Sequence, residues 1–380
     1  MRLSPTLAAM TTYPFVRLDE AKAEARARGI ELIDFGMGEP NEETDPRIRQ
    51  ALAEAIEPRM TYPRATGLPE LREAIARWIS LRFGVAVAPE TEVVPTLGSK
   101  EAIFSFAQAF TGGGRDLVAI PDPAYPVYER GARVAGAEPH PTPLLEEHGF
   151  LPDLDAIPDE VWGRLACFWV NYPNNPTGAV APVSFYDELA AHAAEHGFLV
   201  CSDEAYSEIW FDETPVSALQ AGDRSRIVVF NTLSKRSSMP GYRSGFVAGP
   251  ADVIAALKAF RPTVGTAPQE FVQRASVVAW SDEDHVRATR ALYRRKRDLV
   301  RPALEEAGLR IAGSEASFFL WFAVPEGQTS EGFATRLLEH GIVVAPGSYF
   351  GPTGEGYARL ALVPSEAECE RAAEILRREL

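Results

Sequence analysis

The chain has 380 residues, 46% of them hydrophobic and 24% charged, which is typical of a soluble globular protein with about two domains. Its formal net charge of −15 argues against nucleic acid or an anionic membrane as the main partner. Three widely spaced cysteines favour free thiols over a disulfide framework, and no apolar run is long enough for a membrane span or a signal peptide, so we expect a cytoplasmic protein.

Alternating helices and strands are predicted for most of the chain. Apolar residues at helical spacing predict helices, and short apolar runs between turn residues predict strands buried on both faces. The predicted helices cover residues 17–29, 68–84, 100–110 and 184–196, and the predicted strands cover residues 92–97, 116–121, 165–171, 198–204 and 226–232. This alternation favours βαβ units and a mostly parallel sheet.

The pattern changes near residue 270. A long charged helix is predicted over residues 282–308, followed by "ASFFLWFAV", a helix, "YARLALV" and a final helix, which together indicate a smaller α+β domain. We therefore predict three parts: an N-terminal segment, 1–40, packed on the small domain; a large domain, 41–270; and the small domain, 271–380.

Polar stretches follow four of the predicted strands. They are "GSKEA", "NYPNNPTG", "SDEAY" and "TLSK", with Arg243 shortly after the last of them. Each stretch alone is more typical of a helix cap or a turn than of a ligand site. Ligands of open α/β sheets bind at the carboxyl ends of the strands, so four such stretches together favour a binding site there.

Lys235 in "TLSK" is one of only five lysines, against thirty-three arginines. An arginine stays protonated, whereas a lysine amine can lose its proton and attack a carbonyl. A lysine, a buried acid, an anion-binding turn and an arginine suit pyridoxal phosphate: the lysine forms the Schiff base, the acid keeps the pyridine nitrogen protonated, and the turn and arginine hold the phosphate.

The chain resembles the fold-type I, class I/II aminotransferases over essentially its full length. The resemblance rests on "TLSK" with "RSSMPGYRSGF", and on "NYPNNPTG", "SDEAY", "YPRATGLPELREAI" and "DPAYPVY" in the family's order. It implies a mostly parallel seven-stranded sheet in a large domain that binds pyridoxal phosphate, plus a smaller α+β domain. It also implies a homodimer with shared active sites, acting on amino acids and 2-oxo acids.

The resemblance assigns the cofactor site residue by residue. Lys235 would be the Schiff-base lysine and Asp203 the acid at the pyridine nitrogen, both catalytic. The other cofactor ligands would be Tyr206 and Asn175 at the ring hydroxyl, Tyr125 stacked on the ring, Ser99, Lys100, Ser234 and Arg243 at the phosphate, and Tyr62 at the phosphate of the partner subunit. Family members vary at Lys100, so we expect only its backbone to take part.

The substrate site follows from the same resemblance. Arg359 would clamp the substrate α-carboxylate, with the Gly38 backbone opposite and Asn175 alongside, because a planar guanidinium suits a bidentate contact. Candidates for reading the distal substrate group are Arg17, Arg64 and Arg261, by charge alone.

Several stretches, "RALYRRKR" among them, look most like succinyldiaminopimelate aminotransferases, so glutamate and N-succinyl-2-amino-6-oxopimelate are the expected substrate pair. A broad aspartate or aromatic aminotransferase and a cystathionine β-lyase-like enzyme share the same core and stay open. A regulator domain is disfavoured by the acidic charge. "HAAEH" matches a zinc-protease pattern, but no further ligand accompanies it, so we expect no metal site.

Overall fold

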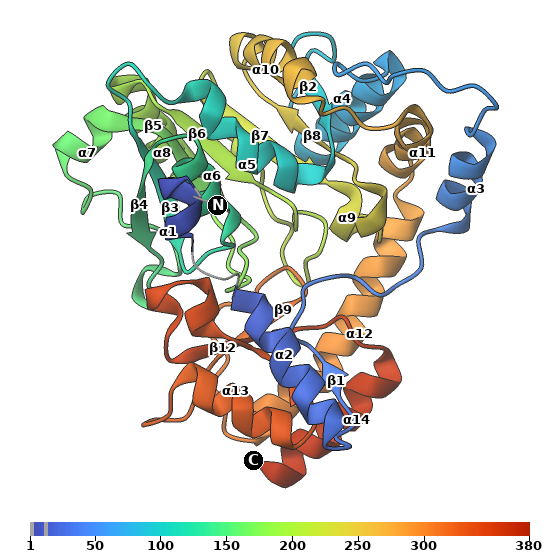
Figure 1. Ribbon diagram of the computed structural model, residues 1–380, viewed down its shortest axis with the longest axis vertical. Coiled ribbons are helices and arrows are strands. Elements are labelled where there is room, and N and C mark those ends of the chain that lie inside the picture. Colours follow the sequence, from blue (N-terminus) through green and yellow to red (C-terminus); the bar gives the residue numbers. More distant parts are fainter. Residues whose placement is uncertain (1–3, 11–13) are drawn as a thin grey trace.

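A seven-stranded sheet forms the centre of the larger of two domains in the computed structural model, which describes residues 4–10 and 14–380 (Figure 1). The strand order is β2-β8-β7-β6-β5-β3-β4, and only β8 runs antiparallel to its neighbours. The predicted mostly parallel, seven-stranded sheet is therefore confirmed. The strands are β2 (Val93–Thr96), β3 (Leu117–Asp122), β4 (Glu138–Pro143), β5 (Leu165–Asn171), β6 (Leu199–Asp203), β7 (Ile227–Thr232) and β8 (Gly245–Ala248).

Burial along the strands explains which of them could be predicted. The strands β3, β5 and β7 are buried along their whole length, as their continuous apolar sequences predict. Strand β4, with the sequence EPHPTP, is mostly exposed and was not predicted. Its prolines cannot donate to a neighbouring strand, and β4 lies at the edge of the sheet, where no such donor is needed.

Helices cover both faces of this sheet and bury two hydrophobic clusters against it. On one face lie α5 (Gly98–Phe110), α6 (Val127–Val134) and α10 (Ala251–Val264). On the other lie α4 (Pro69–Phe83), α7 (Asp159–Arg164), α8 (Val183–His196) and α11 (Glu270–Ser281), with α3 (Pro46–Glu54) packed against α11. The short α9 (Leu233–Arg236) follows β7.

The smaller domain is built on a three-stranded antiparallel sheet in the order β11-β12-β9. Its strands are β9 (Phe319–Ala323), β11 (Ala345–Pro346) and β12 (Tyr357–Ala361), and its helices are α12 (Asp284–Glu306), α13 (Ser330–Glu339) and α14 (Glu366–Glu379). Figure 1 shows α12 running from the large domain into the small one. A third hydrophobic cluster forms the core of this α+β unit.

The N-terminal segment contains α1 (Pro5–Ala9), α2 (Pro14–Ala27) and β1 (Ile33–Asp34). Strand β1 pairs in parallel with β10 (Ile342–Val343) of the small domain, and α2 lies beside α13 (Figure 1). The boundary between the domains is less simple than the predicted residue 270, because α11 packs on α3 and α4 of the large domain. Division by packing would move that boundary to the start of α12.

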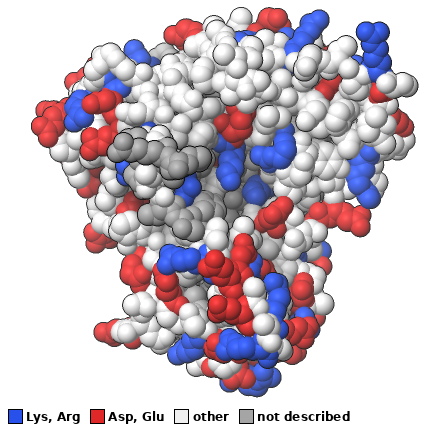
Figure 2. All heavy atoms as spheres, viewed as in Figure 1, with Lys and Arg blue, Asp and Glu red and all other residues white. Residues whose placement is uncertain are grey.

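Two further features of the described residues concern function. No helix between residues 4–10 and 14–380 is both long and apolar enough to cross a membrane. Figure 2 shows a hollow in the middle of one face, between the two domains, with Lys and Arg side chains gathered around it.

Candidate active site

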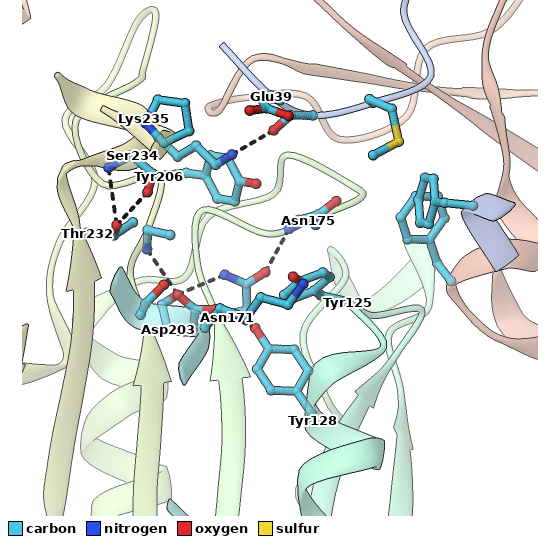
Figure 3. A pocket seen from close by; sticks show the side chains of 18 of the residues that line it. Glu39, Tyr125, Tyr128, Asn171, Asn175, Asp203, Tyr206, Thr232, Ser234 and Lys235 are labelled. Atoms are coloured by element: carbon cyan, nitrogen blue, oxygen red, sulfur yellow. Dashed lines mark hydrogen bonds between the residues drawn. The ribbon is translucent and has the colours of Figure 1, made fainter. Parts of the chain in front are cut away.

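The hollow between the domains is a cavity of about 490 Å³. The carboxyl ends of β5, β6 and β7 meet at it, as expected for an open α/β sheet. All the predicted site residues except Tyr62 line it: Gly38, Ser99, Lys100, Tyr125, Asn175, Asp203, Tyr206, Ser234, Lys235, Arg243 and Arg359. Figure 3 shows six of these side chains on several different elements, those of Tyr125, Asn175, Asp203, Tyr206, Ser234 and Lys235.

Lys235 lies on α9, whose first turn is capped by the Thr232 side chain, which accepts a hydrogen bond of 3.1 Å from the Ser234 backbone N–H. The Lys235 amine donates a hydrogen bond of 2.6 Å to the carbonyl oxygen of Gly38. Burial lowers the pKa of Lys235 to about 8, and Arg359 and Arg243 lower it further, while Glu39 and Asp203 oppose the change. The amine is therefore partly neutral near neutral pH, as a nucleophile or a base must be.

Asp203 is the last residue of β6 and is buried. Its Oδ2 accepts a hydrogen bond of 2.7 Å from the Tyr128 hydroxyl, and its Oδ1 accepts one of 3.2 Å from the Ala205 backbone N–H. Burial raises the pKa of Asp203 to about 6, although these hydrogen bonds and Lys235 oppose the rise. A carboxylate whose pKa is raised by burial is stabilised in its charged form by a cationic partner, so Asp203 favours a cation within the cavity.

Asn171 joins Asp203 to the loop that follows β5. Its side-chain Nδ2 donates to the backbone oxygen of Asp203 at 2.8 Å, and its Oδ1 accepts from the Asn175 backbone N–H at 2.8 Å. Figure 3 shows Asn171 between Asp203 and Asn175, with Tyr125 beside it. The rigid loop predicted from "NYPNNPTG" is thus held by the side chain of its own first residue, Asn171, at the end of β5.

Arg359 of β12 is 2% exposed and forms the small-domain wall of the cavity. Its Nη1 donates to Asn175 Oδ1 and its Nη2 donates to the Gly36 carbonyl oxygen, each at 2.7 Å. The guanidinium carbon lies 4.4 Å from the centre of the Phe319 ring and 4.6 Å from that of Phe350. The guanidinium is therefore held in one orientation, which suits a bidentate contact with a carboxylate.

Two glycines allow close approach within this site. A Cβ at Gly98, whose φ is +74°, would lie 2.8 Å from Arg243 Nη2. A Cβ at Gly38 would lie 3.0 Å from the Phe319 ring. At both places, only a residue without a side chain lets the backbone and the neighbouring group come together.

The opposite end of the cavity is built to hold an anion. Arg243 binds the carbonyl oxygens of Pro240 and Leu97 at 2.9 and 3.0 Å, which places its guanidinium at the N-terminus of α5. The backbone N–H groups of that thirteen-residue helix point toward the same end, where a phosphate is favoured by the helix dipole. The side chains of Ser99 and Ser234 line this part as well.

The groups present fit pyridoxal phosphate. The Gly98 turn, Arg243 and α5 suit a phosphate, while Asp203 suits a protonated pyridine nitrogen and Lys235 suits an aldehyde. Only the backbone of Lys100 was expected to take part. Its side chain also lies at the cavity, with Nζ 5.5 Å from the centre of the Tyr125 ring.

Tyr62 lies outside the cavity and is 99% exposed in the single chain. Among the three arginines considered for the distal group, Arg261 is buried and bonded to Glu101 at 2.7 Å, away from the cavity lining. Arg17 pairs with Glu331 at 3.4 Å, and Arg64 is exposed. Only the two exposed arginines therefore stay candidates for a distal contact.

Sequence reasoning missed several lining residues, chiefly Tyr128, Asn171 and Glu39. Tyr128 ends the stretch "DPAYPVY", and Asn171 begins "NYPNNPTG", so both lay within singled-out motifs. Glu39, next to Gly38, had no such signal. Glu39 and Asp203 are the two acidic residues among the described residues of the lining.

The zinc-like "HAAEH" pattern has a structural explanation. His192 and His196 both stack on the ring of Trp162, with ring centres 4.5 and 5.9 Å from it. Within residues 4–10 and 14–380, no group of three or more His, Cys, Asp or Glu side chains could hold a metal ion.

The sequence and the fold of this chain are similar to those of known proteins. A family model described as aminotransferase class I and II matches residues 30–376. The LL-diaminopimelate aminotransferase of Dehalococcoides mccartyi is 42% identical over 377 residues, which cover 98% of this chain and 97% of the relative.

Two solved structures of Thermus thermophilus proteins are similar as well. A probable N-succinyldiaminopimelate aminotransferase is 34% identical, with a TM-score of 0.89 over 96% of this chain and 100% of the other. A single mutant of the aspartate aminotransferase is 32% identical, with a TM-score of 0.92 over 100% of both chains.

Proposed function

The chain belongs to the class I and II aminotransferases, which depend on pyridoxal phosphate, and from that premise we propose that it exchanges an amino group between LL-diaminopimelate and the 2-oxoglutarate/glutamate pair. The observation that carries the aminotransferase chemistry is one cavity that holds the amine of Lys235, the buried carboxyl of Asp203 and the oriented guanidinium of Arg359.

The proposed roles of the cofactor-binding residues follow from these contacts. The Lys235 amine binds the cofactor covalently, and when free it takes the proton from the substrate α-carbon, for which a pKa lowered to about 8 is suitable. The bound cofactor supplies an electron sink for the charge left on that carbon. Asp203, held by Tyr128, keeps the pyridine nitrogen protonated.

The remaining side chains of the lining bind the ring and the phosphate. We assign Tyr206 and Asn175 to the ring hydroxyl and Tyr125 to the ring face. Ser99, Ser234 and Arg243 hold the phosphate at the N-terminus of α5, together with the backbone and side chain of Lys100. Tyr62 would complete the phosphate site of a partner subunit, and its exposure in the single chain supports a homodimer with shared active sites.

Arg359 is proposed to bind the α-carboxylate of every substrate. Its hydrogen bonds to Asn175 and Gly36 fix the plane of the guanidinium, and the surrounding aromatic rings exclude water from it. Gly38 is proposed to present its backbone to the substrate from the opposite side. Since the guanidinium is buried, a substrate that lacks the carboxylate would lose a charge-assisted contact with it.

Glu39 supports diaminopimelate as the substrate class. Asp203 is assigned to the cofactor, so Glu39 is the other acidic residue of the described lining. It is exposed, at the mouth, and near enough for its charge to raise the pKa of Lys235. A second ammonium group on the substrate would compensate Glu39, whereas glutamate, aspartate and alanine have no such group. The name of the 42% identical relative points to the same substrate.

N-Succinyl-LL-diaminopimelate is the second candidate. It is favoured by sequence resemblance and by the name of the 34% identical Thermus structure. Its added carboxylate would need a cation. Arg64 is exposed, and Arg17 would have to exchange its ion pair with Glu331. The two candidates differ in the charge of the distal group, so the side chains at the mouth of the cavity would distinguish them.

The substrate is tested by comparing kcat/KM for LL-diaminopimelate, its N-succinyl derivative, aspartate and phenylalanine, each with 2-oxoglutarate as acceptor. We expect LL-diaminopimelate to exceed aspartate by about tenfold, since its distal ammonium and carboxylate would be matched by exposed charges that contribute about 1 kcal/mol or less each. Preference for the N-succinyl derivative would select the second candidate. Equal values for aspartate would favour a broad aspartate aminotransferase, and release of pyruvate from cystathionine would favour a lyase.

Domain organisation and location complete the proposal. We propose an N-terminal segment that packs on the small domain, a large domain for the cofactor and a small C-terminal domain, with the second boundary at the start of α12. The cysteines Cys167, Cys201 and Cys369 are all buried and free, which supports a cytoplasmic location.

A further inference from the structure

The helix that carries Lys235 cannot hold its own direction. It has four residues, and a helix of one turn is unstable by itself. Side chains of successive helical residues point about 100° apart, so an anchor on one of them sets the direction of the next. The amine of Lys235 makes one short hydrogen bond, to Gly38, in a different part of the chain.

Arg236, the next residue, points away from the cavity and is 1% exposed. Its guanidinium carbon lies 5.3 Å from the centre of the Trp78 ring and 4.7 Å from that of the Trp280 ring. Nη1 donates to the carbonyl oxygen of Ala279 at 2.8 Å, and Nη2 forms an ion pair with Glu283. Aromatic, backbone and ionic contacts thus hold this side chain in a slot between α4 and α11.

The contacts of Arg236 need an arginine. Burying a cation is costly, and burial lowers the pKa of this guanidinium, so solubility cannot explain its presence. A planar guanidinium can stack on indole rings while two of its nitrogens reach separate acceptors, and a lysine ammonium cannot. The slot is therefore specific for arginine.

A second anchor lies one residue further on. Ser237 Oγ lies 2.8 Å from Nε2 of His285, whose Nδ1 lies 2.7 Å from Oδ2 of Asp282. Ser237 is buried and does not line the cavity, so this Ser-His-Asp arrangement cannot attack a substrate. It joins the end of α9 to the start of α12, and so supports the same orientation of the helix.

We propose that Arg236 is a positioning residue: its insertion between Trp78 and Trp280 sets the rotation of α9 and thereby directs the Lys235 amine into the cavity, against Gly38. The proposal rests on the proposed role of Lys235 and adds a residue that touches neither cofactor nor substrate. If Arg236 leaves the slot, α9 turns and the Lys235 amine loses its buried place.

The test measures the titration of the Lys235 amine in the cofactor-free protein, by acetylating it in competition over a range of pH and quantifying the labelled peptide. In wild type we expect a pKa of about 8. Arg236→Lys and Arg236→Met should each raise it by about one unit, because the amine becomes more exposed to water. The visible absorbance of the cofactor-loaded protein should shift its pH midpoint as well.

Charge and position are separated by two variants. Arg236→Lys keeps the positive charge, so an unchanged Lys235 titration in it would overturn the proposal. Glu283→Ala removes the partner of Arg236: a positioning role predicts a raised Lys235 pKa, whereas loss of a nearby negative charge alone predicts a lowered one. A lowered value in Glu283→Ala would therefore also overturn it, and this variant remains informative if Arg236→Met fails to fold.

Arg115 provides the matched control. It donates to the carbonyl oxygens of Leu165 and His196 at 2.8 and 2.6 Å, next to the start of β3. It therefore lies at the amino ends of the strands, whereas the cavity lies at their carboxyl ends. Arg115→Met should lower the melting temperature and leave the Lys235 titration unchanged. If both arginine variants lower stability alike and neither changes the titration, Arg236 is only structural. Borohydride fixation of the cofactor to another lysine in wild type would instead refute the role of Lys235 itself.

Discussion

The inner wall of the cavity and its mouth are built in different ways. On the inner wall, Asp203, Asn171 and Arg359 are all buried and linked by short hydrogen bonds to Tyr128, Asn175 and the backbone. At the mouth, Glu39 is exposed, while Tyr62 and Arg64 are exposed outside the cavity lining. We therefore expect the chemistry to be preorganised by buried contacts, and selection among substrates to depend on exposed charges.

This difference has a physical reason. A buried hydrogen-bonded group keeps its orientation and acts in a low dielectric, where each contact is worth more than in water. An exposed charge is screened, and an ion pair with it contributes about 1 kcal/mol or less. Substitutions on the inner wall should therefore change rates strongly, and substitutions at the mouth should change preferences modestly.

The largest effect is expected at Lys235. Lys235→Ala should lower kcat by about 10⁴-fold or more, because both the covalent link and the base are lost. Borohydride reduction followed by mass spectrometry should no longer fix the cofactor to the chain. Lys258→Ala, which removes a surface lysine bonded to the Glu90 backbone, is the control and should keep full activity.

Asp203→Asn should lower kcat by about 10²- to 10³-fold with the cofactor still bound, because the pyridine nitrogen loses its anionic partner. Steady-state kinetics and cofactor absorbance measure the two properties. Glu204→Gln is the control and should keep its turnover. The Glu204 carboxyl is bonded to Ser202, Ser217 and the Ala218 N–H and does not line the cavity. Turnover of Asp203→Asn within a few-fold of wild type would show that another group protonates the ring.

The same substitution should stabilise the cofactor-free protein at neutral pH. Burial raises the pKa of Asp203 from 3.8 to about 6, so folding of the charged form is penalised and stability falls as pH rises from about 4 to about 6. The penalty above pH 6 is at most about 3 kcal/mol. The melting temperature of Asp203→Asn should therefore exceed that of wild type at pH 7.5 and be similar to it at pH 4. A melting temperature below that of wild type at pH 7.5 would contradict this.

At the mouth, Glu39→Gln should lower kcat/KM for LL-diaminopimelate about fivefold relative to glutamate, as expected for one exposed charge pair. The ratio of the two donors is the measurement, because any change in the Lys235 pKa affects both alike. Glu43→Gln, which alters an exposed carboxylate paired with Arg49, is the control. An equal loss for both donors would show that Glu39 does not read the distal group.

The smallest effect is expected at Tyr62. Tyr62→Phe should weaken cofactor binding a few-fold, because it removes one of several contacts to the phosphate, without changing the mass measured by light scattering. Tyr357→Phe, which removes a hydrogen bond from the small domain to Glu146 of the large domain, should leave the affinity unchanged. A fully active monomer at assay concentration would refute both the dimer and the role of Tyr62.

Sequence patterns were sufficient for much of the fold. The helices α4, α5, α8 and α12 lie within a few residues of their predicted ranges, since apolar spacing and glycine ends are local properties. The antiparallel direction of β8, the two-residue strand β1 and the packing of α11 on the large domain had no comparable signal. They depend on partners that are distant in the sequence.

The sequence by itself indicated which polar residues end the central strands, and its family motifs indicated the cofactor; the assignment of single residues to that cofactor stays a prediction from the family resemblance. The sequence could indicate the strand ends because strand ends and turns are encoded by neighbouring residues. Only the tertiary structure decided that Tyr128 donates to Asp203, 75 residues away, and that Glu39 faces the cavity. It likewise decided that Arg236 fills a slot between two tryptophans from other helices, because such contacts arise only when separate elements pack together.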